Sequence, residues 1–219
     1  MSARIVLPII ATCFAVCLAL AANEVKAQSI AGNGSFETPA TPDRTTFSAG
    51  QTIGAWTVGS GDVDLLSNWQ AADGQQLLTL SGLQAGSVHQ DLVLTSGQQY
   101  TLSFAMAGDP FQPGYPVTKS MQVLWGTTIV DTPTFNITGK SVLNMGWKTH
   151  TYQLMAPTGT VRLSFISLDN DNAGPALDHV RVTAVPEPQT YALLLAGLSL
   201  ISLRAHSKRK HSLLRFGDA

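Results

Sequence analysis

The residues best suited to chemistry gather in one Pro- and Gly-rich stretch, residues 108–119. This stretch carries Phe111 and Tyr115 among its prolines, and proline restricts a loop so that less entropy is lost when a ligand docks. Sugar binding uses flat aromatic rings beside polar groups, so we predict that these two rings, together with Trp69, form a platform for a carbohydrate. The alternative is that the rings fold back on the edge of the core.

Catalytic motifs do not accompany this loop. The sequence has no G-x-S-x-G, no H-E-x-x-H and no phosphate-binding glycine loop. A glycosidase needs two carboxylates at a set separation, yet residues 28–184 hold a single Glu, and their Asp residues fall mostly in expected turns. We therefore predict that the protein is not an enzyme. The alternative is a weak hydrolase whose aspartates converge from distant loops.

Charge and cysteine content exclude further classes. Cys13 and Cys17 are the only cysteines and both lie near the N-terminus, so the rest of the chain has neither a disulfide nor a thiolate site. Residues 28–188 carry six basic and twelve acidic side chains, a net charge of −6. An acidic domain repels phosphate backbones, so we expect no nucleic-acid partner.

The elements that must position the aromatic loop are strands. Apolar and polar residues alternate with period two through most of the middle of the chain, and Gly- or Pro-containing turns separate the runs. This pattern predicts one all-β sandwich or barrel, with Trp56, Trp125 and Trp147 in its core. The expected strands are residues 54–58, 63–66, 77–81, 88–94, 100–106, 121–125, 150–155, 161–165 and 176–183.

Both ends of the chain have the pattern of targeting segments. Arg4 precedes an apolar run over residues 5–22, and Val25 and Ala27 offer small residues at the −3 and −1 positions, which predicts a signal peptide over residues 1–27. This segment would use the Sec translocon and signal peptidase. Cleavage after Ala22 and an uncut membrane helix are the alternatives.

The C-terminal segment, residues 185–219, has three parts in order. Pro186, Glu187 and Pro188 precede an apolar stretch over residues 191–203, which is followed by Arg and Lys residues. Together they resemble the PEP-CTERM sorting signal of Gram-negative bacteria, which implies processing by an exosortase-type membrane enzyme. We expect a short transmembrane helix there, although its 13 residues fall short of the ~20 of a comfortable span. The alternative is an ordinary C-terminal anchor helix.

A second resemblance covers roughly residues 29–184. Five segments resemble the choice-of-anchor C family of exported bacterial domains, which is related to plant cell-wall proteins of a domain-of-unknown-function class. The segments are NGSFE (33–37), WQAADG (69–74), GQQYTLSF (97–104), NMGWK (144–148) and GPALDHV (174–180). The resemblance implies a galactose-binding-like jelly-roll β-sandwich, the architecture of many carbohydrate-binding modules. Thr79 and His179 depart from the family pattern, where an acidic residue and Asn are usual.

The same resemblance implies a structural calcium ion. In galactose-binding-like sandwiches an acidic residue near each end of the domain often shares one cation, and the matching positions here are Glu37 and Asp178. Calcium takes six to eight oxygens, so backbone carbonyls and Asp64 or Asn33 would have to contribute. The alternative is that Glu37 caps a turn and that Asp178 accepts hydrogen bonds from backbone amides.

The sequence as a whole predicts an exported, non-catalytic binding module at the cell surface or in the extracellular matrix of a Gram-negative bacterium. Its expected partner is a polysaccharide, apart from the export machinery and the membrane in transit. A structural, self-associating matrix protein without a glycan ligand is the alternative from a different class.

Overall fold

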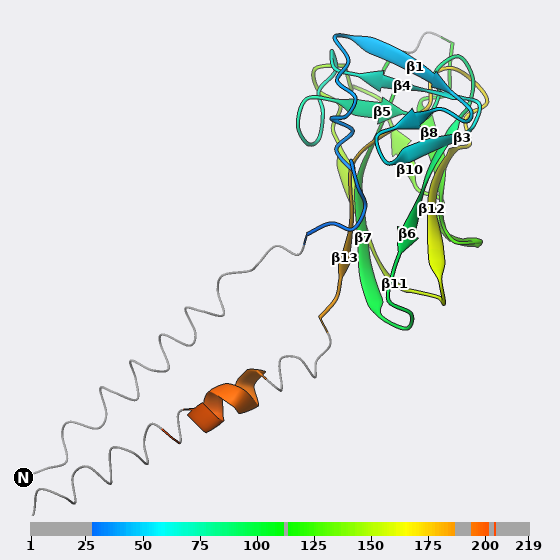
Figure 1. Cartoon of the computed structure of the whole chain (residues 1–219). Coiled ribbons are helices and arrows are strands. Elements are labelled where there is room, and N and C mark those ends of the chain that lie inside the picture. Colours follow the sequence, from blue (N-terminus) through cyan, green and yellow to red (C-terminus); the bar gives the residue numbers. More distant parts are fainter. Residues whose placement is uncertain (1–27, 112–113, 187–193, 202–203, 205–219) are drawn as a thin grey trace, which may run out of the picture.

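In the computed structural model of the chain, residues 28–111, 114–186, 194–201 and 204 are described. Between residues 28 and 186 the chain forms two antiparallel sheets that lie face to face (Figure 1). The predicted β-sandwich is therefore confirmed. The predicted signal peptide, residues 1–27, lies outside the described residues, as do Glu187 and Pro188 of the expected sorting motif.

All nine expected strands form, and four more appear beside them. In chain order the strands are β1 (Arg44–Ser48), β2 (Thr52–Ile53), β3 (Trp56–Ser60), β4 (Asp62–Leu66), β5 (Leu77–Thr79), β6 (Ser87–Val93), β7 (Gln99–Gly108), β8 (Thr118–Trp125), β9 (Thr128–Asp131), β10 (Thr134–Asn136), β11 (Lys148–Met155), β12 (Thr160–Ser167) and β13 (Pro175–Ala184). The strands β1, β2, β9 and β10 were not expected from the sequence. For β1 the reason is its polar sequence, RTTFS, on the edge of a sheet, where only Phe47 packs against the core.

The strand order explains how distant segments meet. One sheet has the order β1-β4-β5-β13-β7-β11, and the other has the order β10-β8-β12-β6-β3-β2 with β9 paired to β8. Successive strands β6, β7 and β8 alternate between the two sheets, and so do β11, β12 and β13. This wrapping around one core is that of a jelly roll.

The core follows from the alternation seen in the sequence. Leu102, Phe104 and Met106 of β7 are fully buried, whereas Ser103 between them points out of the sheet. Phe104 meets Phe165 of the opposite sheet edge-to-face, with ring centroids 5.0 Å apart. Each such side chain contributes about 1.5–3 kcal/mol on burial.

Among the described residues, the core is contained within one stretch of the chain. Every member of its cluster of buried residues lies between Ala31 and Val182. Residues 28–184 therefore carry the packing that one folding unit requires.

The N-terminal segment lies beside the last strand, β13 (Figure 1). The Ile30 N–H donates to the Val182 carbonyl at 2.7 Å, and the Val180 N–H donates to the Gly34 carbonyl at 2.8 Å. A Cβ on Gly34 would stand 1.9 Å from the Val180 carbonyl oxygen, so only glycine fits at this position. The NGSFE segment thus has a structural role, since Gly34 closes on β13 and Phe36 is fully buried.

The C-terminal helix is seen in part. Residues 194–201 and 204 are helical. Among the described residues, no helix combines the length and the hydropathy that crossing a membrane takes. The predicted transmembrane helix over residues 191–203 lies partly outside the described residues and stays a prediction.

Candidate functional site

A pocket of about 350 Å³ opens between the 67–76 loop, the loop after β7 and the edge of the six-stranded sheet. This volume falls within the roughly 300–1,000 Å³ usual for small-molecule sites. All three residues predicted to contact a carbohydrate line it, although Trp69 lies about 40 positions before the other two. The aromatic residues are Trp69, Phe111 and Tyr115; the polar ones include Asp43, Arg44, Asn68, Asp64, Asp109 and Asn172.

The aromatic wall of this pocket is formed by two loops. Trp69 is half-buried against the core, and its ring centroid lies 5.8 Å from that of Phe111 at an interplanar angle of 49°. Phe111 is 62% exposed and Tyr115 is 40% exposed. The two rings of the second loop have therefore not folded back on the core, so a ligand can reach their faces.

Carboxylates converge on the pocket, which the sequence did not reveal. The Asp64 side chain is almost buried; one oxygen accepts a hydrogen bond from the Thr46 hydroxyl at 2.6 Å and the other pairs with the Arg44 guanidinium at 2.5 Å. Burial raises the pKa of Asp64 despite these partners. Burial also raises the pKa of Asp109 to about 6, although the Phe111 N–H and the charge of Lys119 lower it.

A buried cation lies beneath the aromatic wall. The Lys119 side chain is fully buried, and its Nζ has no hydrogen-bond partner among the described residues. Nζ lies 5.9 Å from the centroid of the Tyr115 ring, within the range of a cation–π contact. Lys119 thus places a positive charge behind Tyr115 without exposing it to the pocket.

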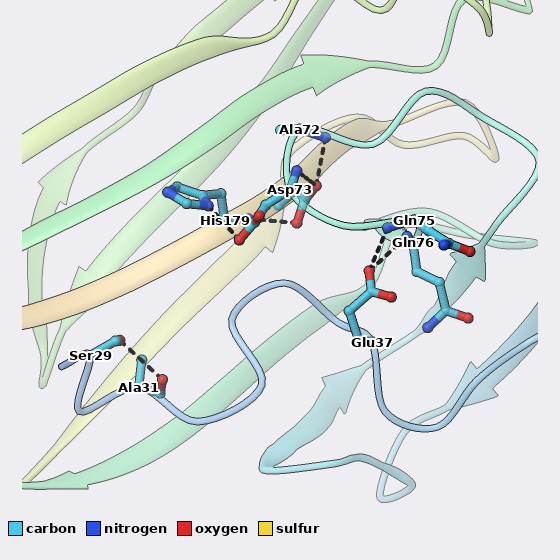
Figure 2. Close-up of polar contacts among 9 residues, drawn as sticks. Ser29, Ala31, Glu37, Ala72, Asp73, Gln75, Gln76 and His179 are labelled. Carbon is cyan, nitrogen blue, oxygen red and sulfur yellow. Dashed lines mark hydrogen bonds and ion pairs between the residues drawn. The ribbon is translucent and has the colours of Figure 1, made fainter.

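The 67–76 loop, which carries Trp69, is held by two carboxylates (Figure 2). One oxygen of Asp178 accepts hydrogen bonds from the N–H groups of Ala72 and Asp73 at 2.7 and 2.9 Å. The other oxygen accepts one from the His179 N–H at 2.6 Å. One oxygen of Glu37 accepts the N–H groups of Gln75 and Gln76, both at 2.8 Å. Burial raises the pKa of Asp178 to about 7, outweighing the three N–H donors that lower it.

These contacts bear on the predicted calcium ion. Three N–H groups point their positive ends at the two oxygens of Asp178, and two point theirs at one oxygen of Glu37, which disfavours a cation at those oxygens. The Asn33 side chain bonds to both the N–H and the carbonyl of Thr38, and Asp64 pairs with Arg44. Within the described ranges no group of three or more His, Cys, Asp or Glu side chains could hold a metal. The backbone-amide alternative therefore accounts for the contacts of both carboxylates, and the calcium ion stays a prediction.

The fold and the pocket define the class of protein: a single jelly-roll β-sandwich with an aromatic-lined pocket at the edge of one sheet. The chain belongs to the family described as "Protein of unknown function (DUF642)", whose sequence model matches residues 29–183. The family match agrees with the expected relation to a domain-of-unknown-function class. A search of curated proteins found no match.

Several solved structures are similar in fold. A family 35 carbohydrate-binding module from Clostridium thermocellum is 14% identical with a TM-score of 0.45, over 65% of this chain and 99% of the module. The CBM22-1 xylan-binding domain from Paenibacillus barcinonensis is 19% identical with a TM-score of 0.44, over 65% and 94%. A third module, solved with β-1,4-galactotriose, is 15% identical with a TM-score of 0.44, over 73% and 100%. At these values no ligand is transferred to this chain.

Proposed function

We propose that this protein is an exported, non-catalytic module that binds a neutral glycan in the pocket formed by Trp69, Phe111 and Tyr115. One observation carries the proposal: three aromatic side chains from two separate loops line a single pocket together with polar side chains. Aromatic rings offer apolar faces to a sugar ring, and the surrounding amides and carboxylates offer hydrogen-bond partners to its hydroxyl groups.

The charges around the pocket favour a neutral ligand. Asp43, Asp64 and Asp109 line it, whereas the charge of its lining cation, Arg44, is taken up by Asp64. A polyuronate would bring further carboxylates to this site and to a domain that is already acidic. Neutral polysaccharides carry no such penalty, so we expect them to bind in preference to anionic ones.

The contacts of Asp64 favour binding over hydrolysis. A retaining or inverting glycosidase uses one carboxylate as nucleophile or base and a second as acid. Both Asp64 oxygens already have partners within the protein, Thr46 and Arg44. Asp64 is therefore poorly placed to act as a nucleophile, which supports a binding role.

Export and sorting are part of the proposal. The signal peptide of residues 1–27 would deliver the domain through the Sec translocon, and the segment of residues 185–219 would be processed by an exosortase-type enzyme. The protein would then lie at the cell surface or in the matrix, as a member of the choice-of-anchor C group. Fractionation of the native host tests this step, because uncleaved chain found only in the cytoplasm would refute it.

Retention on a polysaccharide panel tests the binding step. Residues 28–184 and the variants Trp69→Ala, Tyr115→Ala and Val93→Ala are passed over xylan, galactan, β-glucan and polygalacturonate. We expect retention on at least one neutral polymer, and each aromatic variant to lose about tenfold in affinity, or about 1.4 kcal/mol. Val93 is 83% exposed and lies away from the pocket, so its variant should bind like the parent. Equal retention of all four proteins would refute the site.

Self-association is the second candidate function, and one element favours it. Strand β11 is eight residues long, lies at the edge of its sheet and pairs only with β7 in the part of the chain that the structure describes. Long edge strands are templates for pairing with another chain. Sizing of residues 28–184 across a hundredfold range of concentration tests it, since a constant monomeric size excludes this candidate.

A further inference from the structure

A second hollow, of about 570 Å³, lies on the opposite side of the 67–76 loop from the first pocket. It is formed over the outer face of the six-stranded sheet. Ala105 of β7 and Thr149 of β11 are paired in register and both line the hollow. Because Phe104 and Met106 on either side of Ala105 point into the core, the hollow belongs to the outer face.

His179 is directed to this hollow by the backbone. Its φ is +51°, a conformation that is uncommon for residues other than glycine, and β13 changes register against β7 between Asp178 and Arg181. A β-bulge of this kind re-aims a side chain. The His179 N–H donates to the buried Asp178, which holds the backbone in this strained conformation.

The imidazole of His179 has a fixed partner on one side only. Its Nδ1 lies 2.7 Å from a carboxylate oxygen of Asp73, and Figure 2 shows the two side chains next to each other. Its Nε2 has no hydrogen-bond partner among the described residues, and the side chain is 37% exposed. A polar nitrogen is thus held in a fixed place at the wall of the hollow.

Trp147 forms the aromatic part of the wall. The sequence predicted a core residue, but this side chain is only partly buried, and its Nε1 donates to the Gln70 carbonyl at 2.9 Å. The Gln70 N–H donates to the Val142 carbonyl, and the Gln70 side chain accepts the Met145 N–H at 2.9 Å. These three bonds tie the two rims of the hollow together, so the indole is in place before any ligand arrives.

The sheet beyond the hollow offers an open polar surface. Thr101 and Ser103 on β7, Thr151 on β11 and Thr183 on β13 all have core residues as sequence neighbours and therefore face outward. Arg181 pairs with Ser103 and Gln153 pairs with Thr101 on the same face, and the Gln153 amide hydrogen-bonds the Thr101 hydroxyl. The face thus presents hydroxyl, amide and guanidinium groups at about 3.3 Å per residue. A ligand that extends from the hollow would meet hydroxyl groups along its length.

From these features we infer that the hollow of Trp147 and His179 is a second glycan site, one that takes an extended neutral chain along the outer face of β13, β7 and β11. The indole would stack on one sugar, His179 would bond to its hydroxyl group, and the following sugars would lie over the threonine and serine row. The ligand class rests on the function proposed above, whereas the site rests on the hollow itself.

The four tryptophans provide a direct test, because each reports a different place. Trp69 lines the first pocket and Trp147 the second hollow, whereas Trp56 and Trp125 are buried in the core. Isotope-labelled residues 28–184 are titrated with xylohexaose, cellohexaose and a β-1,4-galactohexaose while the four indole N–H signals are recorded by NMR. Single Trp→Phe variants assign the signals.

We expect one hexasaccharide to shift the Trp147 signal saturably while both core signals stay still. The shift should persist in Trp69→Ala and fall at least tenfold in affinity in His179→Asn, since Asn tolerates the left-handed backbone that His179 adopts. Thr149→Tyr, on an exposed position, should block the hollow without disturbing the core.

The two proposals fail in different ways. If Trp69 responds to a sugar and Trp147 responds to none, the second site is refuted and the first stands. If Trp147 responds equally in the parent, His179→Asn and Thr149→Tyr, the hollow is not where the sugar binds and the inference is refuted. If neither signal responds to any of the three sugars, both proposals are refuted for neutral hexasaccharides.

Discussion

Removal of the Asp178 carboxylate should loosen the 67–76 loop and lower stability by a predictable amount. Asp178→Ala deletes the acceptor of three backbone N–H groups. Because the raised pKa leaves Asp178 largely protonated below pH 7, its hydrogen bonds are assigned the ordinary net value of about 0.5–1.5 kcal/mol each, and water can replace those to the exposed residues Ala72 and Asp73. We therefore take about 1 kcal/mol per bond, or about 3 kcal/mol in total, which is a fall in Tm of about 6–12 °C for a domain of this size.

Asp178→Asn should lower stability by less than Asp178→Ala. The amide oxygen keeps one acceptor for the three backbone N–H donors around this side chain. The amide oxygen can accept from Ala72 and Asp73, but the NH2 group then faces the His179 N–H. We expect a loss of about 1–2 kcal/mol. Thermal melting of residues 28–184 followed by circular dichroism measures both variants.

The stability that Asp178 contributes should fall as pH rises. Because burial raises the pKa of Asp178 from 3.8 to about 7 in the folded state, its contribution to stability is present below pH 4 and lost as pH rises through 7. The difference between the two pKa values sets an upper bound of roughly 4 kcal/mol. Asp178→Asn cannot ionise, so the difference in stability between parent and variant should be largest at pH 4 or below and should narrow steadily as pH rises to 8.

A surface ion pair provides the control. Asp91 accepts two hydrogen bonds from the Arg162 guanidinium at 2.7 and 2.8 Å, but both side chains are about half exposed. Asp91→Ala should therefore cost less than about 1 kcal/mol. The reasoning fails if Asp178→Ala melts within 2 °C of Asp91→Ala, about what half a kcal/mol would shift, or if the gap for Asp178→Asn widens from pH 5 to pH 8.

Further predictions concern single groups. Gly34→Ala forces a Cβ against the Val180 carbonyl, so we expect a loss above about 3 kcal/mol in chemical denaturation; a near-neutral effect would contradict the close approach. Lys119→Met removes a buried ammonium without a hydrogen-bond partner, so Tm should rise by the equivalent of about 1 kcal/mol; a lower Tm would show that the charge stabilises its surroundings. Retention on a neutral glycan should increase from pH 5 to pH 7 as the Asp109 carboxyl, with a pKa of about 6, loses its proton and becomes a stronger acceptor; Asp109→Asn should flatten this profile. A calcium chelator should leave Tm unchanged, and a fall of several degrees would restore the predicted calcium site.

Several strands were predictable because they have a clear period of two, whereas β4 and β5 are buried at every position. The run from Tyr100 to Met106 alternates with small or polar residues, and that alternation is what one buried face requires. The edge strand β1 was not predictable, since its side chains are mostly exposed and its place depends on pairing with β4. Such pairing depends on residues elsewhere in the chain, which a local pattern does not contain.

The candidate site was predictable in its aromatic residues and not in its charges. Phe111 and Tyr115 stand out because prolines and glycines surround them. The convergence of Asp64 and Asp109 could not be predicted without the structure, because Asp64 lies in β4 and Asp109 directly follows β7. Trp147 was misjudged for a related reason: it precedes a strand whose pattern indicates burial, but that strand lies at the sheet edge.

The 67–76 loop contributes to both hollows, which limits how the shape of one hollow can change without changing the other. Trp69 lines one hollow and Gln70 lines the other, so a substitution that displaces the 67–76 loop would change the shape of both hollows at once. The outer walls are separate, since Asp109, Phe111 and Tyr115 line only the first hollow, and Asn144, Gly146 and Trp147 line only the second. Under the two binding proposals, randomising one outer wall while keeping the 67–76 loop, Glu37 and Asp178 should change binding in one hollow and leave the other as it is.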